Sequence, residues 1–468
     1  VFRQVYPPKN NAWFARFATA AAIRNRRREA LCEAFNVYGY GVTPPVMNWV
    51  ASDLFSQGIN RILVMPYLYS DRKKRKICCS TDFSPRVPQW DAMQTLVRFW
   101  KWCGAFFAGA FEAPVWVLAH TAHPTTERNV CKALHIQAEN NALRILKELS
   151  DHGIFYRLAD LSDLQSGKTA SLLIVPSISQ EVKTALKSYT GRVVSDIPAD
   201  IDAYCEIDII NGKGCRLLPC LRKNGRSLMI FNPSDHEVNF IFCDHRHWCE
   251  ELPPDPVFSE YSPLLGNDGQ WEILLPPGGI RIIRALQNDV LRSYAISPIE
   301  IGAPIELHLK FAIKSVERMH LSLTGKTRFI RSALNSPLPA SGNYCDVDSD
   351  FSGRILLESF IISPFEGEAF LLFESISHYA RVALNGQDCG ERAFAPWMFR
   401  VKMKMGENLL QLQISGSAGN EFRRCFREEL QPAGWFNVYA KIIKGFEQND
   451  GRCGLDGSIR LIPIFHSE

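Results

Sequence analysis

Hydrophobic and polar positions follow three different patterns along the chain, and each pattern predicts a different kind of structure. Between residues 29 and 69, two runs of successive apolar residues flank a segment with helical spacing that has prolines at its start and Gly58 at its end. Successive apolar residues are typical of parallel strands that are covered on both faces. This order predicts a strand, a helix over 44–58 and a second strand, followed after a loop by a long helix between residues 90 and 110.

A new alternation of strands and helices begins near residue 115. We expect strands at 115–120, 154–158, 171–176 and 192–195, and helices at 130–152 and 181–189. Strands and helices of this size in alternating order favour a small doubly wound α/β domain. No glycine-rich phosphate loop follows its first strand, so nucleotide binding is not predicted.

Helical periods largely stop beyond residue 200, where short strands separated by turn residues take over. Segments such as 226–234 and 237–243 predict a β-sandwich up to about residue 300. The last third of the chain alternates apolar and polar residues around an Asn-Gly turn at Asn385 and a Gly-Glu-Asn turn at Gly406, which predicts a second β-sandwich or a jelly roll. The predicted fold class is therefore multidomain, with α/β elements followed by an all-β part.

Composition and charge exclude only a few classes of function. The 468 residues are 46% hydrophobic and 22% charged, and the formal net charge of +4 is too small to predict nucleic acid as a partner. The basic run 72–76 is interpreted as a solvated loop. No apolar segment approaches the roughly 20 residues that cross a bilayer, so no membrane partner is predicted. The 14 cysteines lack framework spacing, which favours reduced thiols and a cytoplasmic location.

One carboxylate is notable because it lies at the end of the first predicted strand. Side chains alternate along 29–35, so Leu31 and Glu33 share one face. From the residues alone, a salt bridge or a helix cap is an ordinary interpretation of Glu33. Glu29 has the same parity but lies at the entry end of the strand among arginines, where a surface ion pair is expected.

Several segments together resemble large bacterial glycoside hydrolases of family 106, the α-L-rhamnosidase-like group. In that family a glutamate at the end of a late barrel strand precedes an aromatic and glycine turn and a helix, as Glu33 precedes FNVYGYG and TPPVMNWVASDLFSQGIN here. The segments RILVMPYLYS and DFSPRVPQW resemble the last barrel strand and the loop after it. LPPGGIRII resembles the end of the intervening sandwich, and the turns at Asn385 and Gly406 resemble the sugar-binding jelly roll of β-galactosidases and β-glucuronidases.

The resemblance implies a domain order and an activity. It implies the C-terminal part of a (β/α)8 barrel over 1–112, a flavodoxin-like domain over 113–200, a β-sandwich over 201–300 and a jelly-roll domain over 301–468. A whole barrel takes about 250 residues, so the chain resembles the C-terminal part of a longer enzyme with a second carboxylate on an earlier strand. The implied activity is that of a glycosidase acting on terminal sugars of plant or host glycans. No cofactor is expected, and calcium is the one ion that the resemblance allows.

Two carboxyl groups break a glycosidic bond. The resemblance implies that Glu33 is the general base of an inverting enzyme, and the role of nucleophile in a retaining enzyme stays open. The candidate substrate-binding residues offer aromatic faces or hydrogen bonds to sugar hydroxyls: Tyr38, Tyr40, Tyr67, Tyr69, Asp82, Arg86 and Trp90. Core packing is the alternative for the tyrosines, and an internal loop-fixing pair is the alternative for Asp82 and Arg86. A β-galactosidase-type hydrolase and a non-catalytic carbohydrate-binding protein are the alternative functions.

The segment CDHRHWC, from Cys243 to Cys249, is the candidate metal site of the chain. Its cysteines and histidines alternate, so in one straight strand they would share a face. Four side chains of a straight strand cannot converge on the tetrahedron that zinc requires. No metal site is therefore predicted.

Overall fold

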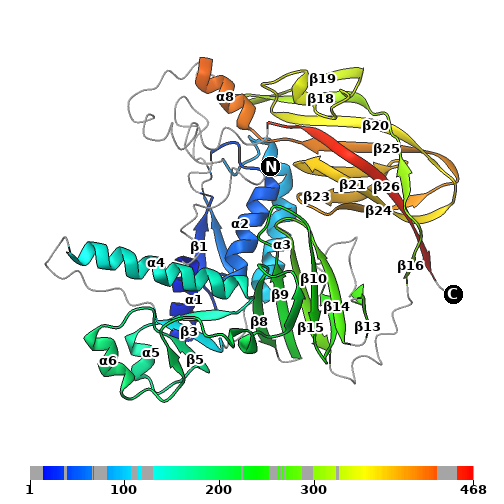
Figure 1. Ribbon diagram of the computed structural model, residues 1–468. Coiled ribbons are helices and arrows are strands. Elements are labelled where there is room, and N and C mark those ends of the chain that lie inside the picture. The colour runs from blue at the N-terminus through cyan, green and yellow to red at the C-terminus, as the bar shows by residue number, and fades with distance from the viewer. Residues whose placement is uncertain are drawn as a thin grey trace.

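The computed structural model describes residues 14–35, 39–65, 67, 82–106, 113–118, 130–222, 225–251, 262–263, 265–267, 269–286, 299–322, 326–428 and 451–466. Its elements form four groups in chain order: an N-terminal group of helices with a two-stranded sheet, a small α/β domain, and two β units. Figure 1 shows the N-terminal group in the middle of the molecule, with the α/β domain and the first β unit below it and the second β unit above. No helix within these ranges is both long and apolar enough to cross a membrane.

The N-terminal group contains the predicted strand, helix and strand. Its elements are α1 (Phe14–Arg24), β1 (Leu31–Ala34), α2 (Pro44–Ser56), β2 (Arg61–Val64), η3 (Pro88–Ala92) and α3 (Met93–Phe106). Strands β1 and β2 pair in parallel, as the sequence predicts. Gly58, which follows α2, has a φ of +90°, and a Cβ there would lie 2.5 Å from Cγ2 of Thr19. Only glycine allows the chain to turn this close to α1.

One face of the β1–β2 sheet is open. Ala34 and Ile62 pack on the helices behind the sheet, whereas Leu31 and Leu63 on the other face are 57% and 48% exposed. The expectation that both strands are covered on both faces is therefore wrong for this chain. Its physical reason is that nothing in the described part of the chain buries the second face.

The α/β domain has the predicted alternating order. Its elements are β3 (Val115–Leu118), α4 (Val130–Asp151), β4 (Tyr156–Ala159), α5 (Leu161–Gln165), β5 (Leu172–Ile174), α6 (Gln180–Leu186) and β6 (Val193–Val194). The strands are parallel in the order β4-β3-β5-β6, which agrees with a doubly wound sheet. Sequence periodicity missed α5 because it is only five residues long, although Asp160 and Asp163 form a capping box at its start.

The first β unit consists of two antiparallel sheets, in agreement with the predicted sandwich. It contains η4 (Ile201–Tyr204), β7 (Asp208–Asn211), β8 (Arg216–Arg222), β9 (Gly225–Phe231), β10 (Val238–Cys243), β11 (His247–Glu251), β12 (Ser262–Pro263), β13 (Leu265–Asn267), β14 (Gln270–Leu275) and β15 (Ile280–Leu286). The sheet orders are β13-β14-β10-β7 and β12-β11-β15-β9-β8. Gly278, between β14 and β15, has a φ of +65°, and a Cβ there would lie 2.4 Å from Cδ1 of Trp49. Gly278 therefore lies directly against Trp49 of α2, with no space for a side chain.

The second β unit also consists of two sheets, which enclose one hydrophobic core. It contains β16 (Ile299–Ile301), β17 (Ile305–Leu307), β18 (Ala312–His320), β19 (Arg328–Pro337), η5 (Tyr344–Asp346), β20 (Gly353–Ser363), β21 (Gly367–Ser377), β22 (Tyr379–Leu384), β23 (Gln387–Arg392), β24 (Trp397–Met403), β25 (Gly406–Ser415), α8 (Gly419–Glu428) and β26 (Gly454–His466). The larger sheet has the order β19-β18-β20-β25-β22-β23. Asn385 and Gly386, both with positive φ, form the predicted turn between β22 and β23.

The N-terminal group packs against both β units. One hydrophobic core combines side chains of α2 and α3 with side chains of the first and second β units. Trp49 of α2 meets Phe231 of β9 edge to face, with 5.5 Å between the ring centroids. On the other side, Asp91 of η3 accepts hydrogen bonds from Arg354 and Ser415. The N-terminal group is therefore joined to both β units by apolar packing and hydrogen bonds.

Candidate active site

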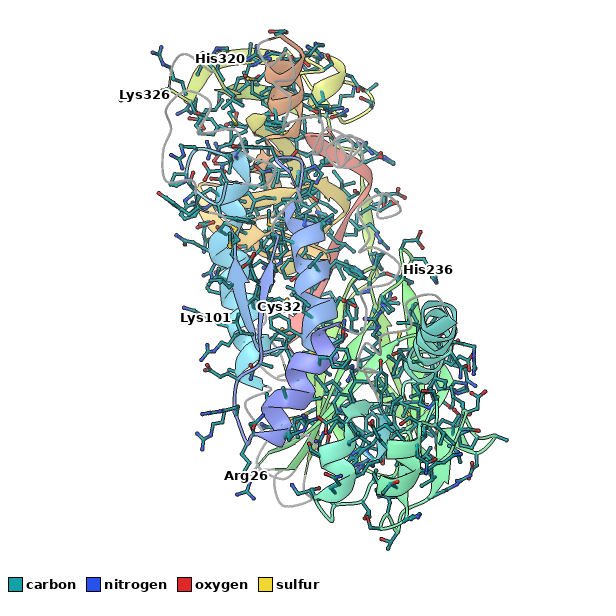
Figure 2. All side chains as sticks on the ribbon, turned by 90° about the vertical axis from the view of Figure 1, so that its left-hand side faces the viewer. Arg26, Cys32, Lys101, His236, His320 and Lys326 are labelled. Carbon is teal, nitrogen blue, oxygen red and sulfur yellow. The ribbon has the colours of Figure 1, made fainter. Side chains whose placement is uncertain are left out.

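Glu33 lies on the open face of β1, one residue before the strand ends. It is opposite Leu63 in the parallel sheet, and Leu31 shares its face. The thiol of the neighbouring Cys32 donates to the carbonyl oxygen of Glu33 at 3.3 Å. Burial and the nearby Glu33 carboxylate raise the pKa of this thiol. The open face thus carries two charged side chains, Glu33 and Arg61, beside Leu31 and Leu63. Figure 2 shows Cys32 of β1, which lies on the opposite face, midway along the molecule.

An ion pair lies at the amino ends of β1 and β2. A guanidinium N–H of Arg61 donates to the Glu29 carboxylate at 2.6 Å, and both side chains are about 60% exposed. This confirms the surface ion pair predicted for Glu29. The two carboxylates on this side of β1 therefore differ in surroundings, because Glu29 is paired with Arg61 at the start of the strand while Glu33 lies near its carboxyl end.

Phe35, directly after β1, has an unusual backbone conformation. Its φ is +71°, which is rare for a bulky side chain, and it is 1% exposed. Its ring stacks on Trp100 with centroids 5.6 Å apart and also contacts Phe83 at 5.8 Å. These contacts hold a strained backbone position two residues after Glu33, a feature typical of functional sites. The sequence contains no signal for it, because phenylalanine has no preference for this conformation.

Three of the predicted substrate-binding residues lie together. Arg86 places its guanidinium carbon 5.7 Å from the ring centroid of Tyr67, which is 65% exposed. The Arg86 Nε–H donates to Asp82 at 2.9 Å, and Asp82 is 3% exposed. The alternative of an internal loop-fixing pair thus matches the geometry of Asp82 and Arg86. Tyr67 remains an accessible aromatic face beside that pair.

The remaining predicted substrate-binding residues have different surroundings. Tyr40 is 3% exposed, and its ring stacks on Phe422 of α8 with 4.6 Å between centroids. This burial agrees with the core-packing alternative and argues against direct contact between Tyr40 and a sugar. Trp90 in η3 is 37% exposed and accessible for stacking. Tyr38 and Tyr69 lie outside the described residues, as does the basic run 72–76.

The cysteine and histidine segment forms a turn between two strands. Strand β10 ends at Cys243 and β11 begins at His247, so the segment is not one straight strand. The side chain of His245 in the turn is 93% exposed. Among the residues that the structure describes, no three His, Cys, Asp or Glu side chains form a cluster that could hold a metal ion.

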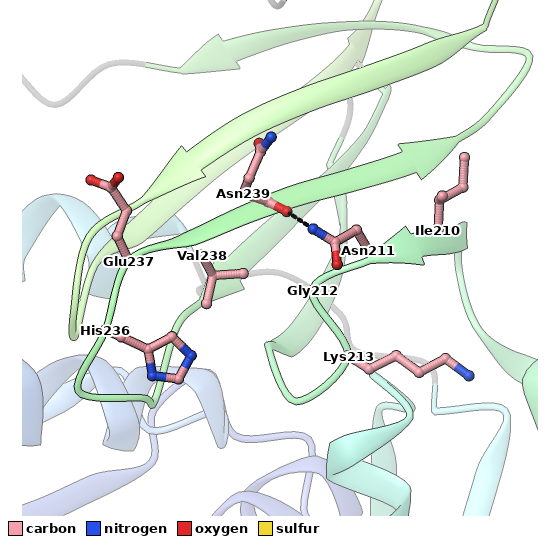
Figure 3. A pocket seen from close by; sticks show the side chains of 8 residues that line it. All are labelled: Ile210, Asn211, Gly212, Lys213, His236, Glu237, Val238 and Asn239. Carbon is pink, nitrogen blue, oxygen red and sulfur yellow. Dashed lines mark hydrogen bonds between the residues drawn. The ribbon is translucent and has the colours of Figure 1, made fainter.

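Among the described residues, the first β unit carries open hollows, and Glu33 lines neither the one at the start of β10 nor the one at the turn between β10 and β11. The larger hollow has a volume of about 500 Å³ and lies between the turn after β7 and the start of β10. The side chain of Asn211 donates to the carbonyl oxygen of Asn239 at 2.7 Å across its wall (Figure 3). Lys213 and His236 extend from its rim, and they do not converge on a common point. A shallow hollow of this shape gives no candidate for catalysis.

Comparisons with known proteins give solved structures with a similar fold. No family model matches the sequence, and no curated protein matches it either. A rhamnosidase from Novosphingobium sp. PP1Y has a similar structure, with a TM-score of 0.66 and 12% sequence identity, over 98% of this chain and 50% of that chain. A β-galactosidase from Bacillus circulans sp. alkalophilus has a TM-score of 0.37 at 10% identity, over 60% of this chain and 59% of that chain.

The similarity to the rhamnosidase covers nearly every described element and spans about half the length of that structure. The chain has a glycoside hydrolase-like fold. At 12% identity the similarity shows the fold alone. The activity and the roles of individual residues therefore depend on the geometry at the end of β1.

Proposed function

We propose that the chain is part of a glycoside hydrolase that removes terminal sugars, with Glu33 as one of its two catalytic carboxylates. The observation that carries the proposal is the position of Glu33 on the open face of a parallel strand, close to its carboxyl end. In α/β barrels the catalytic groups come from the carboxyl ends of several strands. The similarity to half of a rhamnosidase supports sugar hydrolysis as the chemistry.

In this proposal β1 and β2 are two strands of a (β/α)8 barrel that further chain completes. Inward-facing side chains fill the interior of such a barrel in layers. Leu31 and Leu63 would belong to those layers, which accounts for apolar side chains on a face that is open here. The strands that complete the barrel would supply the second carboxylate. The second β unit would be the jelly roll of the same enzyme.

The proposed mechanism divides the work between the two carboxyl groups. Glu33 takes a proton from a water molecule as that water attacks the sugar carbon, while the partner carboxylic acid protonates the leaving oxygen. A separation of about 6.5–9.5 Å between the two groups leaves room for the water, whereas about 5–5.5 Å makes Glu33 the nucleophile of a retaining enzyme. Tyr67 and Trp90 are accessible on the segments that follow β2 and are the proposed sugar contacts.

The test compares two glutamates of the same strand region in the full-length protein. Glu33→Gln keeps the shape of the side chain but removes its charge, so we expect kcat on a chromogenic sugar to fall about 10²- to 10⁴-fold. Glu29→Gln is the matched control and should keep kcat, because exposed ion pairs contribute little. The substrates are 4-nitrophenyl α-L-rhamnoside and 4-nitrophenyl β-D-galactoside, which separate the two proposed specificities.

Three outcomes decide the proposal. Loss of turnover only in Glu33→Gln, with sugar binding retained in calorimetry, supports the catalytic role. Wild-type turnover in Glu33→Gln, equal to that of Glu29→Gln, rejects it. A wild-type protein that binds these sugars but hydrolyses neither points instead to a carbohydrate-binding protein.

A further inference from the structure

We propose that Gln89 is a positioning residue that holds the turn 40–42, which follows Glu33 in the sequence, against helix α8 of the second β unit. The inference rests on the proposed catalytic role of Glu33. It adds that the second β unit is a working part of the active site and not a separate module.

Gln89 is a buried side chain that joins three distant segments. It lies in η3 and is 1% exposed. Its Nε2 donates to the carbonyl oxygen of Tyr40 at 2.6 Å and to that of Val42 at 3.2 Å. Its Oε1 accepts from the backbone N–H of Ala418 at 3.1 Å. A side chain that donates twice and accepts once is required here, and the glutamine amide supplies both functions.

Helix α8 also contacts this turn directly. The ring of Phe422 lies parallel to that of Tyr40, with 9° between the ring planes. A Cβ on Gly419 would lie 2.9 Å from the Cα of Gly41, so the two backbones are in direct contact there. The turn is therefore held between Gln89 and α8, and its polar backbone groups are partly satisfied by Gln89.

The position of α8 is in turn fixed by the second β unit. Glu421 is 0% exposed and accepts hydrogen bonds from the backbone N–H of Leu321 and from Arg424, both at 2.7 Å. The backbone N–H of Glu421 donates to Ser352 Oγ at 2.9 Å. A buried carboxylate is stable only with such a complete set of partners. These bonds fix α8 relative to the second β unit, and α8 contacts the turn 40–42.

Residues near Glu33 in the sequence are held by other elements at two places. Phe35, two residues after Glu33, is held by Trp100 of α3. Tyr40 and Val42 are held by Gln89 of η3. A displacement of a catalytic group by about 1 Å can lower the rate by about 10²-fold. The geometry thus assigns Gln89 a role in rate through Glu33, without contact between Gln89 and the sugar.

The test uses two Gln89 variants and a control across the same interface. Gln89→Leu removes every side-chain hydrogen bond, and Gln89→Glu keeps the shape but places a carboxylate against two carbonyl oxygens. Thr95→Val is the matched control, because Thr95 Oγ1 donates to Glu391 at 2.5 Å between α3 and β23, away from the turn. We expect kcat to fall by about 10-fold or more in both Gln89 variants, with KM changed by less than about threefold. Thr95→Val should keep kcat.

Hydrogen exchange gives a readout that does not depend on activity. Amides in 39–47 should exchange faster in Gln89→Leu than in the wild type and in Thr95→Val. Phe422→Leu should have the same effect from the side of α8 if Gln89→Leu does not fold. Unchanged exchange in 39–47, or kcat losses that follow the melting temperature equally in all variants, would overturn the inference. An inactive Glu33→Gln with fully active Gln89 variants refutes only this inference, whereas an active Glu33→Gln refutes the proposed function itself.

Discussion

The β1–β2 sheet and the second β unit expose their apolar side chains to very different degrees. In the second β unit, inward side chains such as Leu371 and Leu412 are fully buried between two sheets. In the β1–β2 sheet, Leu31 and Leu63 are about half exposed, although Met47 of α2 behind the sheet is fully buried. The open face is therefore a local feature of a well-packed group of elements. Besides the two leucines, the open face carries Glu33 and Arg61, so it is a mixed apolar and charged surface.

The carboxylates of the molecule also differ in how exposed they are. Glu421 of α8 and Asp91 of η3 lie in closed surroundings, where each is paired with an arginine. Glu33 is exposed on the open face. Charges in closed regions need such partners because desolvation is costly. Glu33 thus differs from these two carboxylates in its exposure.

The largest expected effect comes from the closed core. Leu412→Ala removes a fully buried side chain of β25, so we expect the free energy of unfolding to fall by about 2–5 kcal/mol. Gln411→Ala, one residue earlier and on the outer face, should cost less than about 1.5 kcal/mol, since it removes one hydrogen bond to Glu358. Urea denaturation of both variants measures the difference. Equal costs would show that the second β unit does not have the closed core described.

A smaller effect is expected where the two regions meet. Asp91→Asn removes the charge that receives two hydrogen bonds from Arg354, which we expect to cost about 1.5–3 kcal/mol of unfolding free energy. Asp388→Asn is the control, because its bond to Arg381 is about half exposed and should contribute less than about 1 kcal/mol. Thermal unfolding of the two variants compares the contributions. Similar shifts would mean that Asp91 does not fasten the open sheet to the closed unit.

Trp90→Ala tests whether the open side of the molecule binds sugar. Trp90 is 37% exposed, so its loss should weaken sugar binding by about 1 kcal/mol, or roughly fivefold in Kd, with little change in stability. Isothermal titration with the sugar of the active substrate measures the first quantity, and thermal unfolding measures the second. A lower melting temperature with unchanged Kd would identify Trp90 as a core residue.

Local features of the fold could be predicted from the sequence. The prolines and Gly58 predicted both ends of α2, because proline starts helices and the turn needs a positive φ. Asn385 and Gly386 predicted the hairpin between β22 and β23 for the same reason. The ion pair of Glu29 followed from its place among arginines. In each case the residues that decide the structure are neighbours in the chain or lie on adjacent strands.

Features that depend on distant segments could not be predicted. Tyr40 was expected near a sugar, but Phe422 of α8 covers its ring, and no sequence pattern links the two residues. The bonds of Gln89 to Tyr40 and Ala418 were missed for the same reason. The exposure of Leu31 was also missed, because an apolar strand has the same pattern whether the layer that covers it belongs to the chain or not. Glu33 itself remains a prediction supported by its position.

The smallest expected effect tests whether further chain covers the open face of the β1–β2 sheet. Leu31→Ser changes a side chain that is 57% exposed, so in the 468-residue chain it should alter the free energy of unfolding by less than about 0.5 kcal/mol. In a full-length protein whose barrel covers this face, the same substitution should cost about 1.5–3 kcal/mol, because the leucine is then buried. Ile62→Ser, on the packed face of the sheet, is the control and should be costly in both proteins. A small cost of Leu31→Ser in both would mean that no further strands cover β1, and the carboxylate of Glu33 would then lack the enclosed cavity in which a second carboxylate could act with it.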